Sequence, residues 1–398
     1  MQRRLLAVSL AWRAAAVALL VGTRLVQRDF DSSATLLRHT LGTRDSAWAW
    51  DALAVPFCRW DTLYFVAAAR FGYTYEQMLA FQPGIVGVLR LAGALTAPWS
   101  ATVAVLVATA LANVATAVSP LLLYRLTRRH MPHKFAYTAA LLSVFAPASM
   151  SALAAPTPEP FFSVFSLAGM LLLDGSVVGD LLGAASFAAA TLFRANGILL
   201  AGYVVWHVYT RRASVPWAAL LIAVGVAPFI AFQAWAHTRL CPGQPWCTAV
   251  PPLVYSYVQR MYWDVGPFRY WTLAQVPNFI LAAPVVGFGA VQAFAYLRTV
   301  PLHAYLPWSA HRPWALPYVV HMAVLCTLLF VASHVQIALR FATPGGMPAL
   351  WWALAAAVGG RGGDTFPALR VPLRAVVGYL AVYAVIAGVL YAGFYPPA

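Results

Sequence analysis

The sequence has very few charged residues. Asp, Glu, Lys and Arg make up only 9% of its 398 residues, whereas soluble domains carry about 25%. Hydrophobic residues account for 62% of the chain, and the mean hydropathy is +0.73. This composition excludes a soluble globular protein and indicates a chain that crosses a membrane several times.

Acidic residues and lysine are the scarcest charged types. The chain has 11 acidic residues, and Lys134 is its only lysine, so the net charge of +15 comes almost entirely from arginine. In a soluble protein this excess would suggest a nucleic-acid partner. Here the arginines lie mainly between apolar runs, where they orient membrane segments and contact anionic lipid headgroups. We therefore expect membrane lipids, and no nucleic acid, as partners.

Cysteines and the common catalytic motifs are also rare. The four cysteines form no CxxC pair, and no cluster of His and Cys has the spacing of a zinc site. Cys241 and Cys247 bracket the polar loop CPGQPWC, and they could form a disulfide if that loop faces an oxidising lumen. The sequence holds no P-loop, GxSxG or HExxH motif. It therefore predicts neither a bound metal nor a cofactor.

Long apolar runs dominate the rest of the chain. Each span in a bilayer must satisfy its own backbone hydrogen bonds, so these runs predict helices. We predict an all-α polytopic membrane protein, a single unit over residues 1–398 with about eleven transmembrane helices. The runs lie near 5–26, 101–124, 135–153, 161–173, 180–194, 196–210, 215–236, 277–297, 316–336, 341–358 and 375–394. We interpret the first run as a retained signal anchor, because no convincing cleavage site follows it.

The arginine-rich connections predict the orientation of the chain. Together with Arg3 and Arg4, these connections should face the cytoplasm. They are 124–134, 210–212, 298–312 and 361–374. All these connections can face the cytoplasm only if the apolar stretch 83–97 does not cross the membrane. We therefore predict a re-entrant or interfacial helix there. The large loops 27–82 and 237–276 then face the lumen, and we expect the function on that side.

The first luminal loop contains the stretch CRWDTLYFVAAARFGYTYE, residues 58–76. Its apolar spacing predicts an amphipathic interfacial helix near 60–71 that ends at Gly72. Asp61 falls in the first turn, where residue type supports a helix cap and a general base equally. Glu76 is more typical of a solvated loop acid. Glu159 opens a later span and is more typical of an acid that complements a helix dipole.

Polar residues also stand at the ends of other predicted spans. Arg194 and Asn196 lie between two apolar runs, where an arginine either faces a pocket or extends to the membrane surface. His334, Gln336 and Arg340 lie at the end of another span. A lone histidine is more often an interior residue than a catalyst. Gln336 and Arg340 are four positions apart, and we predict that they share a helix face.

The second luminal loop mixes aromatic residues with amides, acids and arginines over residues 255–279. An aromatic belt at the membrane surface explains the Tyr and Trp residues, but not the polar residues among them. This mixture suits a sugar bound beside an anionic group, because aromatic rings pack on sugar faces and the arginine guanidinium can donate two parallel hydrogen bonds to a phosphate.

These segments, in this order, resemble the GPI mannosyltransferase II family, known as PIG-V. The resemblance is carried by RWDTLYF, GYTYEQMLAFQPG, PTPEPFF, FRANG and HVQIALRF, and most specifically by the run at 245–285. The chain departs from the family pattern at Gln77, where the family has histidine. It also has FQPG in place of FFPG, and TPEP in place of a SEAL-like stretch.

The resemblance implies a GT-C type glycosyltransferase of the endoplasmic reticulum membrane, with a luminal active site near the first long loop. The implied donor is dolichyl-phosphate mannose, and the implied acceptor is the GPI precursor that carries one mannose. A β-linked donor that yields an α1,6 bond implies inversion in a single displacement, which needs one base and an anion-stabilising site. The family also leaves room for a small membrane accessory subunit.

On this resemblance we assign site roles as hypotheses. Asp61 is the base, and Glu76 is a ligand of the acceptor hydroxyl or an alternative base. The residues that would hold the donor phosphate and its sugar are Arg194, Asn196, His334, Gln336 and Arg340. The residues that would line the acceptor and sugar site are Trp60, Tyr75, Gln259, Tyr262, Trp263 and Asn278.

Three other functions compete with this interpretation. Another polyprenyl-phosphate-mannose transferase would keep the donor and change the acceptor, and the run at 245–285 argues against it. A lipid or sugar transporter would generally show inverted repeats, which we do not find in the sequence. A non-catalytic membrane scaffold would keep its function after neutralisation of Asp61.

Overall fold

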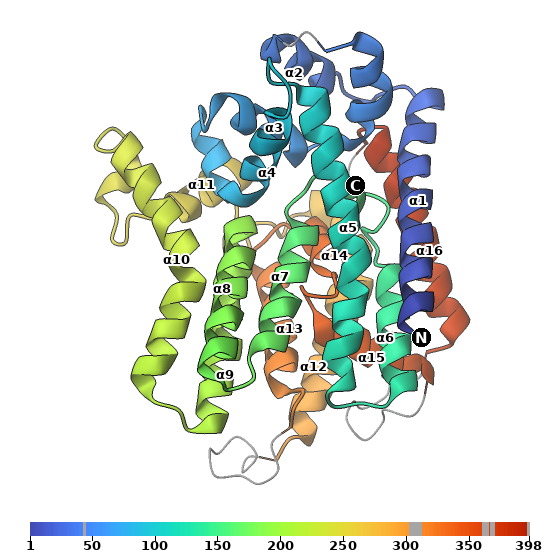
Figure 1. Ribbon diagram of the computed structural model, residues 1–398, viewed down its shortest axis with the longest axis vertical. Helices are drawn as coiled ribbons and strands as arrows, with labels where there is room; N and C mark the ends of the chain where they lie inside the picture. The colour runs from blue at the N-terminus through green and yellow to red at the C-terminus, as the bar shows by residue number, and fades with distance from the viewer. Residues whose placement is uncertain (43–44, 302–312, 360–365, 367–370, 396–398) are drawn as a thin grey trace.

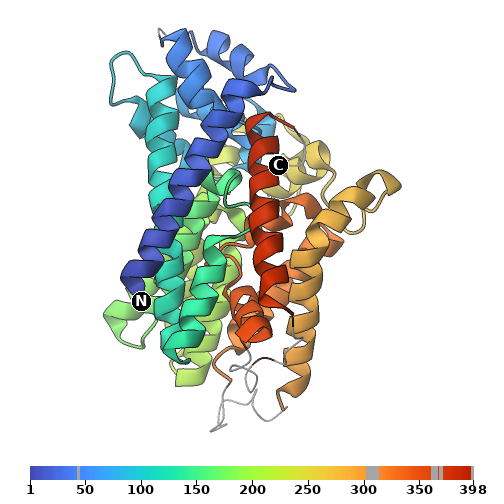
Figure 2. The ribbon, with the colours of Figure 1, turned by 90° about the vertical axis from the view of Figure 1, so that its right-hand side faces the viewer.

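The computed structural model describes residues 1–42, 45–301, 313–359, 366 and 371–395. All regular elements among these residues are helical, and this part of the chain contains no strand. The long helices run along the long axis of the molecule and form a bundle (Figure 1, Figure 2). The predicted all-α class is confirmed.

Five of the described helices are long and apolar enough to cross a membrane. They are α1 (Gln2–Val26), α5 (Ala101–Arg128), α10 (Val215–Leu240), α12 (Val276–Thr299) and α16 (Leu373–Ala392). The shorter helices of the bundle are α6 (His133–Val144), α7 (Glu159–Leu172), α8 (Val177–Phe193), α9 (Ala201–Arg211), α13 (Leu316–Val331) and α15 (Pro348–Gly359). These are shorter than a typical span of about 20 residues, so the count of about eleven crossing helices stays a prediction.

Proline and glycine set several helix ends that the apolar runs did not reveal. Helix α6 ends at Val144 rather than near residue 153, and α15 begins at Pro348 rather than near 341. Pro147 follows α6, and the stretch TPGGMP leads into α15. Proline has no amide hydrogen and disfavours helical backbone in the residue before it. The predicted run 196–210 forms two elements, the 3-10 helix η5 (Ala195–Leu200) and α9.

The stretch 83–97 forms α4 (Pro83–Gly93), which has 11 residues. At 1.5 Å per residue such a helix is about 16 Å long, roughly half the thickness of the hydrocarbon core. It packs against α3 (Asp61–Phe71) and α5 at the end of the bundle opposite the N-terminus (Figure 1). Its length fits a stretch that does not cross, and a re-entrant path stays a prediction.

The first loop covers this end of the bundle. Its elements are α2 (Ser33–Leu41), the π-helix η1 (Ala49–Ala54), η2 (Val55–Phe57), α3 and η3 (Glu76–Ala80). The helix predicted near 60–71 is therefore present, and Gly72 with φ +82° ends it. The N-terminus and the α5–α6 and α9–α10 connections lie together at the other end (Figure 1). The basic segments 124–134 and 210–212 thus share one end of the bundle, as their charge predicts.

A buried arginine fixes the start of α3. Arg59 is fully buried, and its guanidinium donates to the two carboxylate oxygens of Asp29 at 2.7 and 3.3 Å. It also donates to the carbonyl of Ala392 at 2.7 Å. Arg59 therefore ties the chain before α3 to the segment after α1 and to the end of α16. These contacts fix where Asp61 enters the bundle.

Candidate active site

The candidate site begins at the first residue of α3. Trp60, immediately before it, has φ +51° and ψ −123°, a conformation that residues other than glycine rarely adopt. Such backbone outliers gather at functional sites. The Trp60 ring packs on Phe394 at 4.8 Å between centroids. The next residue is Asp61, whose side chain is 34% exposed.

Asp61 does not cap α3 but pairs with Arg340 of α14 (Ala338–Phe341). Arg340 Nη1 lies 2.6 Å from Asp61 Oδ2, and its Nη2 lies 2.7 Å from Glu159 Oε1. Glu159 is the first residue of α7 and is only 2% exposed. One guanidinium thus bridges two carboxylates from distant parts of the chain. Asp61 stands in the first turn of α3, where it complements the helix dipole, but its side chain forms no cap hydrogen bond among the described residues. The dipole interpretation of Glu159 is incomplete.

Arg194 completes the group from the other side of Glu159. Its Nη1 forms an ion pair with the same Glu159 oxygen, and its Nε donates to Asn196 Oδ1 at 3.1 Å. The Arg194 guanidinium also lies 4.3 Å from the centre of the Phe341 ring. We name these residues the acid–arginine cluster: Asp61, Glu159, Arg194, Asn196 and Arg340.

The acid–arginine cluster combines two carboxylates with two guanidinium groups, so its formal charges cancel. Buried charges are tolerated only when they are paired in this way. Asn196 Nδ2 and Arg340 Nε are buried and have no hydrogen-bond partner among the described residues. Arginine forks match the geometry of phosphate, and Asp61 is the most exposed charged group of the four. The cluster can therefore bind an anion beside an accessible carboxylate.

A second polar group gathers around Tyr270. The His334 ring packs on Tyr270 at 4.5 Å between centroids, and the Tyr270 hydroxyl donates to Gln336 Oε1 at 3.3 Å. Asn278 Nδ2 donates to the Tyr270 oxygen at 2.9 Å, and His334 Nε2 contacts the carbonyl of Trp263. Burial raises the pKa of Tyr270, so its hydroxyl stays protonated at neutral pH. Three predicted site residues, His334, Gln336 and Asn278, therefore meet at a tyrosine that we did not predict.

Gln336 and Arg340 do not share a helix face as predicted. Gln336 belongs to the 3-10 helix η9 (Val335–Ile337), whereas Arg340 belongs to α14. Their side chains reach Tyr270 and Asp61 respectively. A 3-10 helix turns every three residues, so positions four apart no longer align.

Glu76 is not a solvated loop acid. Its carboxylate accepts hydrogen bonds from Trp246 Nε1 and from the Tyr262 hydroxyl, both at 3.0 Å. Trp246 lies in η6 (Pro245–Thr248), inside a loop closed by the disulfide between Cys241 and Cys247, and Tyr262 lies in α11 (Val254–Trp263). The bond to Glu76 raises the pKa of Tyr262, which keeps its hydroxyl a donor. Glu76 therefore joins the two large loops.

Two of the predicted residues stand apart from these groups. Tyr75 is exposed, and Gln259 is half-buried on α11. Among the described residues, no hydrogen bond or ion pair joins either side chain to the acid–arginine cluster. In the described part of the chain, no group of three or more His, Cys, Asp or Glu lies close enough together to hold a metal ion.

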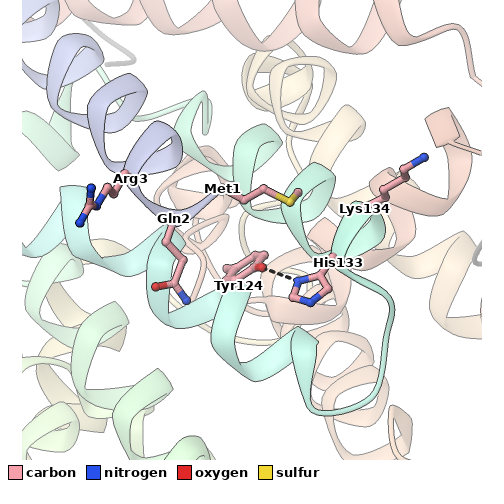
Figure 3. Close-up of a pocket in the computed structure, with 6 residues that line it drawn as sticks. All are labelled: Met1, Gln2, Arg3, Tyr124, His133 and Lys134. Atoms are coloured by element: carbon pink, nitrogen blue, oxygen red, sulfur yellow. Dashed lines mark hydrogen bonds between the residues drawn. The ribbon is translucent and has the colours of Figure 1, made fainter.

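A cavity of about 660 Å³ opens at the other end of the molecule, beside the N-terminus. Its lining residues are Met1, Gln2, Arg3, Tyr124, His133 and Lys134 (Figure 3). The Tyr124 oxygen and His133 Nδ1 lie 2.8 Å apart there. Since this lining holds no carboxylate and none of the predicted site residues, we place the candidate active site at the acid–arginine cluster.

The parts played by Glu159 and Tyr270 were not predicted from the sequence. The chain has only two glutamates, Glu76 and Glu159, and a carboxylate at the end of an apolar helix requires a partner. The arginines that follow other apolar runs were the available partners, so this signal was present. Tyr270 gave no such signal, because membrane-surface tyrosines are common.

Comparison with known proteins shows the family of the chain. The family model described as Mannosyltransferase (PIG-V) matches residues 4–398. GPI mannosyltransferase 2 of Cryptococcus neoformans is 34% identical over 390 residues, covering 86% of this chain and 89% of the relative. Human GPI alpha-1,6-mannosyltransferase 2 is 31% identical over 359 residues, covering 74% and 71%.

Among solved structures, the archaeal oligosaccharyltransferase AglB from Archaeoglobus fulgidus aligns with a TM-score of 0.40 and 14% identity. The alignment covers 97% of this chain and 56% of that one. This likeness is too distant to carry an argument. The family match extends over nearly the whole sequence and includes every residue of the acid–arginine cluster. The chain therefore belongs to the PIG-V family of mannosyltransferases.

Proposed function

We propose that the chain transfers mannose from dolichyl-phosphate mannose to the GPI precursor that carries one mannose, forming an α1,6 bond. The family match and the names of the relatives support transfer to a GPI precursor. The arrangement of the acid–arginine cluster supports the proposed reaction. It places an accessible carboxylate against a pair of arginines that suit a phosphate.

The proposed reaction is a single displacement with inversion. The acceptor hydroxyl oxygen attacks the anomeric carbon of mannose, the bond from that carbon to the phosphate oxygen breaks, and the lipid phosphate leaves with the electron pair. Asp61 takes the proton of the attacking hydroxyl. An ionised aspartate suffices, because a phosphate departs without needing a proton. Arg340 engages Asp61 Oδ2, and Oδ1 is the oxygen proposed to accept the proton.

Arg194 and Arg340 would stabilise the charge that develops on the leaving phosphate. Glu159 holds both guanidinium groups and so orients them before the donor arrives. Asn196, His334 and Gln336 would complete the donor site. The acceptor and sugar site would include Trp60, Tyr75, Gln259, Tyr262, Trp263 and Asn278, with Glu76 as acceptor ligand or alternative base.

We place this site on the luminal side of the endoplasmic reticulum membrane. The basic connections 124–134 and 210–212 lie at the end of the bundle opposite α3 (Figure 1), and basic connections favour the cytoplasm. The disulfide between Cys241 and Cys247 suits an oxidising lumen. A small membrane accessory subunit remains part of the proposal.

The proposed transfer needs no metal, because the guanidinium groups of Arg194 and Arg340 can donate hydrogen bonds to the phosphate where a divalent cation would otherwise bind it. We expect transfer by the purified protein to continue at its full rate in excess EDTA. The measurement is mannose incorporation from dolichyl-phosphate mannose with and without the chelator. Loss of activity that a divalent cation restores would contradict this prediction.

Expression in cells that lack their own second GPI mannosyltransferase tests the proposed function. The wild-type chain should restore GPI-anchored protein at the surface, and Asp61→Asn at equal expression should leave the one-mannose precursor accumulated. If Asp61→Asn also restores anchors and Glu76→Gln does not, Glu76 is the base. A chain that transfers mannose in vitro without restoring anchors would point to a different acceptor.

A further inference from the structure

Helix α16 ends in a backbone conformation that usually requires glycine. The amide nitrogen of Phe394 lies 3.1 Å from the Tyr391 carbonyl oxygen. The amide nitrogen of Tyr395 lies 2.9 Å from the Leu390 carbonyl oxygen, which completes a Schellman motif with Phe394 at its C′ position and φ +63°. Glycine is the usual residue there, and a bulky side chain at positive φ is a steric outlier. The Phe394 side chain therefore needs an explanation other than helix termination.

The Phe394 ring packs against the two residues that precede the proposed base. Its centroid lies 4.8 Å from the centroid of the Trp60 ring and 5.3 Å from the guanidinium carbon of Arg59. Phe394 is buried, and Asp61 follows Trp60 directly as the first residue of α3. The end of α16 lies at the same end of the bundle as α3 (Figure 1). One ring therefore connects α16 to the point where the proposed base enters the site.

Packing, rather than side-chain hydrogen bonding, holds Trp60 in its strained conformation. Its φ of +51° is as rare for a bulky residue as that of Phe394. Within the described ranges, the indole nitrogen of Trp60 has no hydrogen-bond partner and α3 has no side-chain cap. Arg59 is fixed by its own hydrogen bonds, so the remaining freedom lies at Trp60. If the contact with Phe394 were lost, Trp60 would relax and Asp61 would move with it.

We propose that Phe394 is a positioning residue for mannose transfer, because its ring holds Trp60 and thereby fixes the place of Asp61. This inference rests on the function proposed above. Arg340 Nη1 lies 2.6 Å from Asp61 Oδ2, a contact that requires the first turn of α3 in one position. Reacting groups displaced by about 1 Å can lose about 10²-fold in rate, so a small relaxation at Trp60 is sufficient. Phe394 thus acts through Trp60 and Asp61, not on the reacting atoms.

Transfer kinetics of the purified full-length chain test this role. Phe394→Leu keeps an apolar side chain and removes the flat ring. We expect kcat to fall about tenfold with the donor KM unchanged, because alignment of the base is lost and donor binding is kept. In Phe394→Gly, glycine suits the left-handed backbone and preserves the end of α16, so the same fall there excludes an unravelled helix as the cause. A wild-type kcat in both variants, or a raised donor KM alone, would overturn the proposal.

Tyr395→Leu is the matched control, because Tyr395 is the next residue and its substitution also removes an aromatic contact. Its ring packs on Phe30 at 5.1 Å between centroids, so this contact leads to the chain after α1 rather than to α3. We expect its kcat to equal that of the wild type. An equal fall in Tyr395→Leu and Phe394→Leu would show that the segment matters only for overall packing, and it would overturn the proposal.

A double-mutant cycle identifies the residue through which Phe394 acts. Asp61→Asn removes the base, so the position of residue 61 no longer limits the residual rate. Adding Phe394→Leu to Asp61→Asn should therefore lower that rate by less than about twofold. A further fall of about tenfold, as expected in the wild-type background, would show that the two residues act independently and would overturn the proposal.

Hydrogen exchange separates this inference from the proposed function, because it needs no substrate. The amide of Leu63 donates to the carbonyl of Trp60 at 3.0 Å, so its exchange reports on the backbone at Trp60. We expect faster deuterium uptake there in Phe394→Leu but not in Tyr395→Leu. Uptake equal to that of the wild type in Phe394→Leu would overturn the proposal even if kcat fell. Faster uptake in Phe394→Leu, beside a wild-type chain that transfers no mannose, would refute the proposed function and leave Phe394 assigned to the start of α3.

Discussion

At the scale of single residues, Glu159 organises the candidate site. Its Oε1 is shared by Arg194 and Arg340, and Arg340 in turn holds Asp61. A carboxylate that is 2% exposed is costly to bury alone, and so are the guanidinium groups that it neutralises. The three side chains therefore stabilise one another, and loss of one would leave an unpaired charge.

Glu159→Gln should destabilise the protein by about 3–5 kcal/mol, because it leaves two largely buried arginines without their shared counter-ion. We expect a lower melting temperature in detergent and loss of mannose transfer. Glu159→Asp keeps the charge and should recover part of both. A Glu159→Gln protein with wild-type melting temperature and activity would show that the arginines do not depend on this carboxylate.

Arg340→Lys should lower kcat/KM by about tenfold or more while the protein stays folded. A lysine ammonium is a point charge and cannot hold two carboxylates as a planar fork does. The matched control is Arg269→Lys, since Arg269 pairs with Asp264 at 3.0 Å on the exposed surface and such pairs contribute little. Equal kcat/KM values for the two variants would argue against a role for the planar guanidinium of Arg340 in holding the two carboxylates.

The sequence singled out Asp61, Arg194 and Arg340 but not their pairing. Asp61 and Arg340 are 279 positions apart, and no periodicity connects two such residues. These residues stood out because charged residues are rare in this apolar chain and each buried charge requires a partner. Which acid meets which arginine depends on how the helices pack, and local pattern does not contain that information.

At the scale of elements, Glu76 couples two loops that lie far apart in the sequence. It connects η3 in the first loop to η6 and α11 in the second. A hydrogen bond to a charged group contributes about 1.5–3 kcal/mol when buried and less when one partner is exposed, as Tyr262 is. The second loop is thus held to the first by these polar contacts together with a buried apolar cluster that includes Leu79, Trp246 and Val258.

Tyr262→Phe should loosen this contact without unfolding the bundle. We expect faster proteolytic cleavage within 241–263 and a modest rise in the acceptor KM, with little change in the melting temperature. Tyr64→Phe serves as the control, because Tyr64 is an exposed tyrosine of α3 whose ring packs on Phe81. Cleavage of both variants at the wild-type rate would show that the Tyr262 hydroxyl does not hold the loop.

The apolar runs predicted where helices form better than where they end. Helices α1, α5, α10, α12 and α16 lie where long runs predicted them. Shorter runs were misjudged at Val144 and at Pro348, where proline and glycine interrupt the backbone. The 3-10 helices η5 and η9 could not be predicted, because they depend on packing rather than on composition.

At the scale of the whole molecule, the bundle separates two chemical ends. The basic connections 124–134 and 210–212 lie at the end that holds the N-terminus, and α3, which begins with Asp61, lies at the end covered by the first loop (Figure 1). Charge and hydropathy predicted this polarity from the sequence, because both act on whole segments. The cluster itself depends on α3, α7, η5 and α14 meeting, which is a property of the complete fold.

Mannose transfer by the purified protein tests the central claim most directly. Wild type and Asp61→Asn, at matched purity and melting temperature, are given dolichyl-phosphate mannose and a one-mannose GPI precursor. Loss of a general base typically costs about 10²–10⁴ in rate, so the wild type should form the two-mannose product and Asp61→Asn should be slower by at least about 10². Equal rates for the two proteins would contradict the assignment of Asp61 as the base of the acid–arginine cluster.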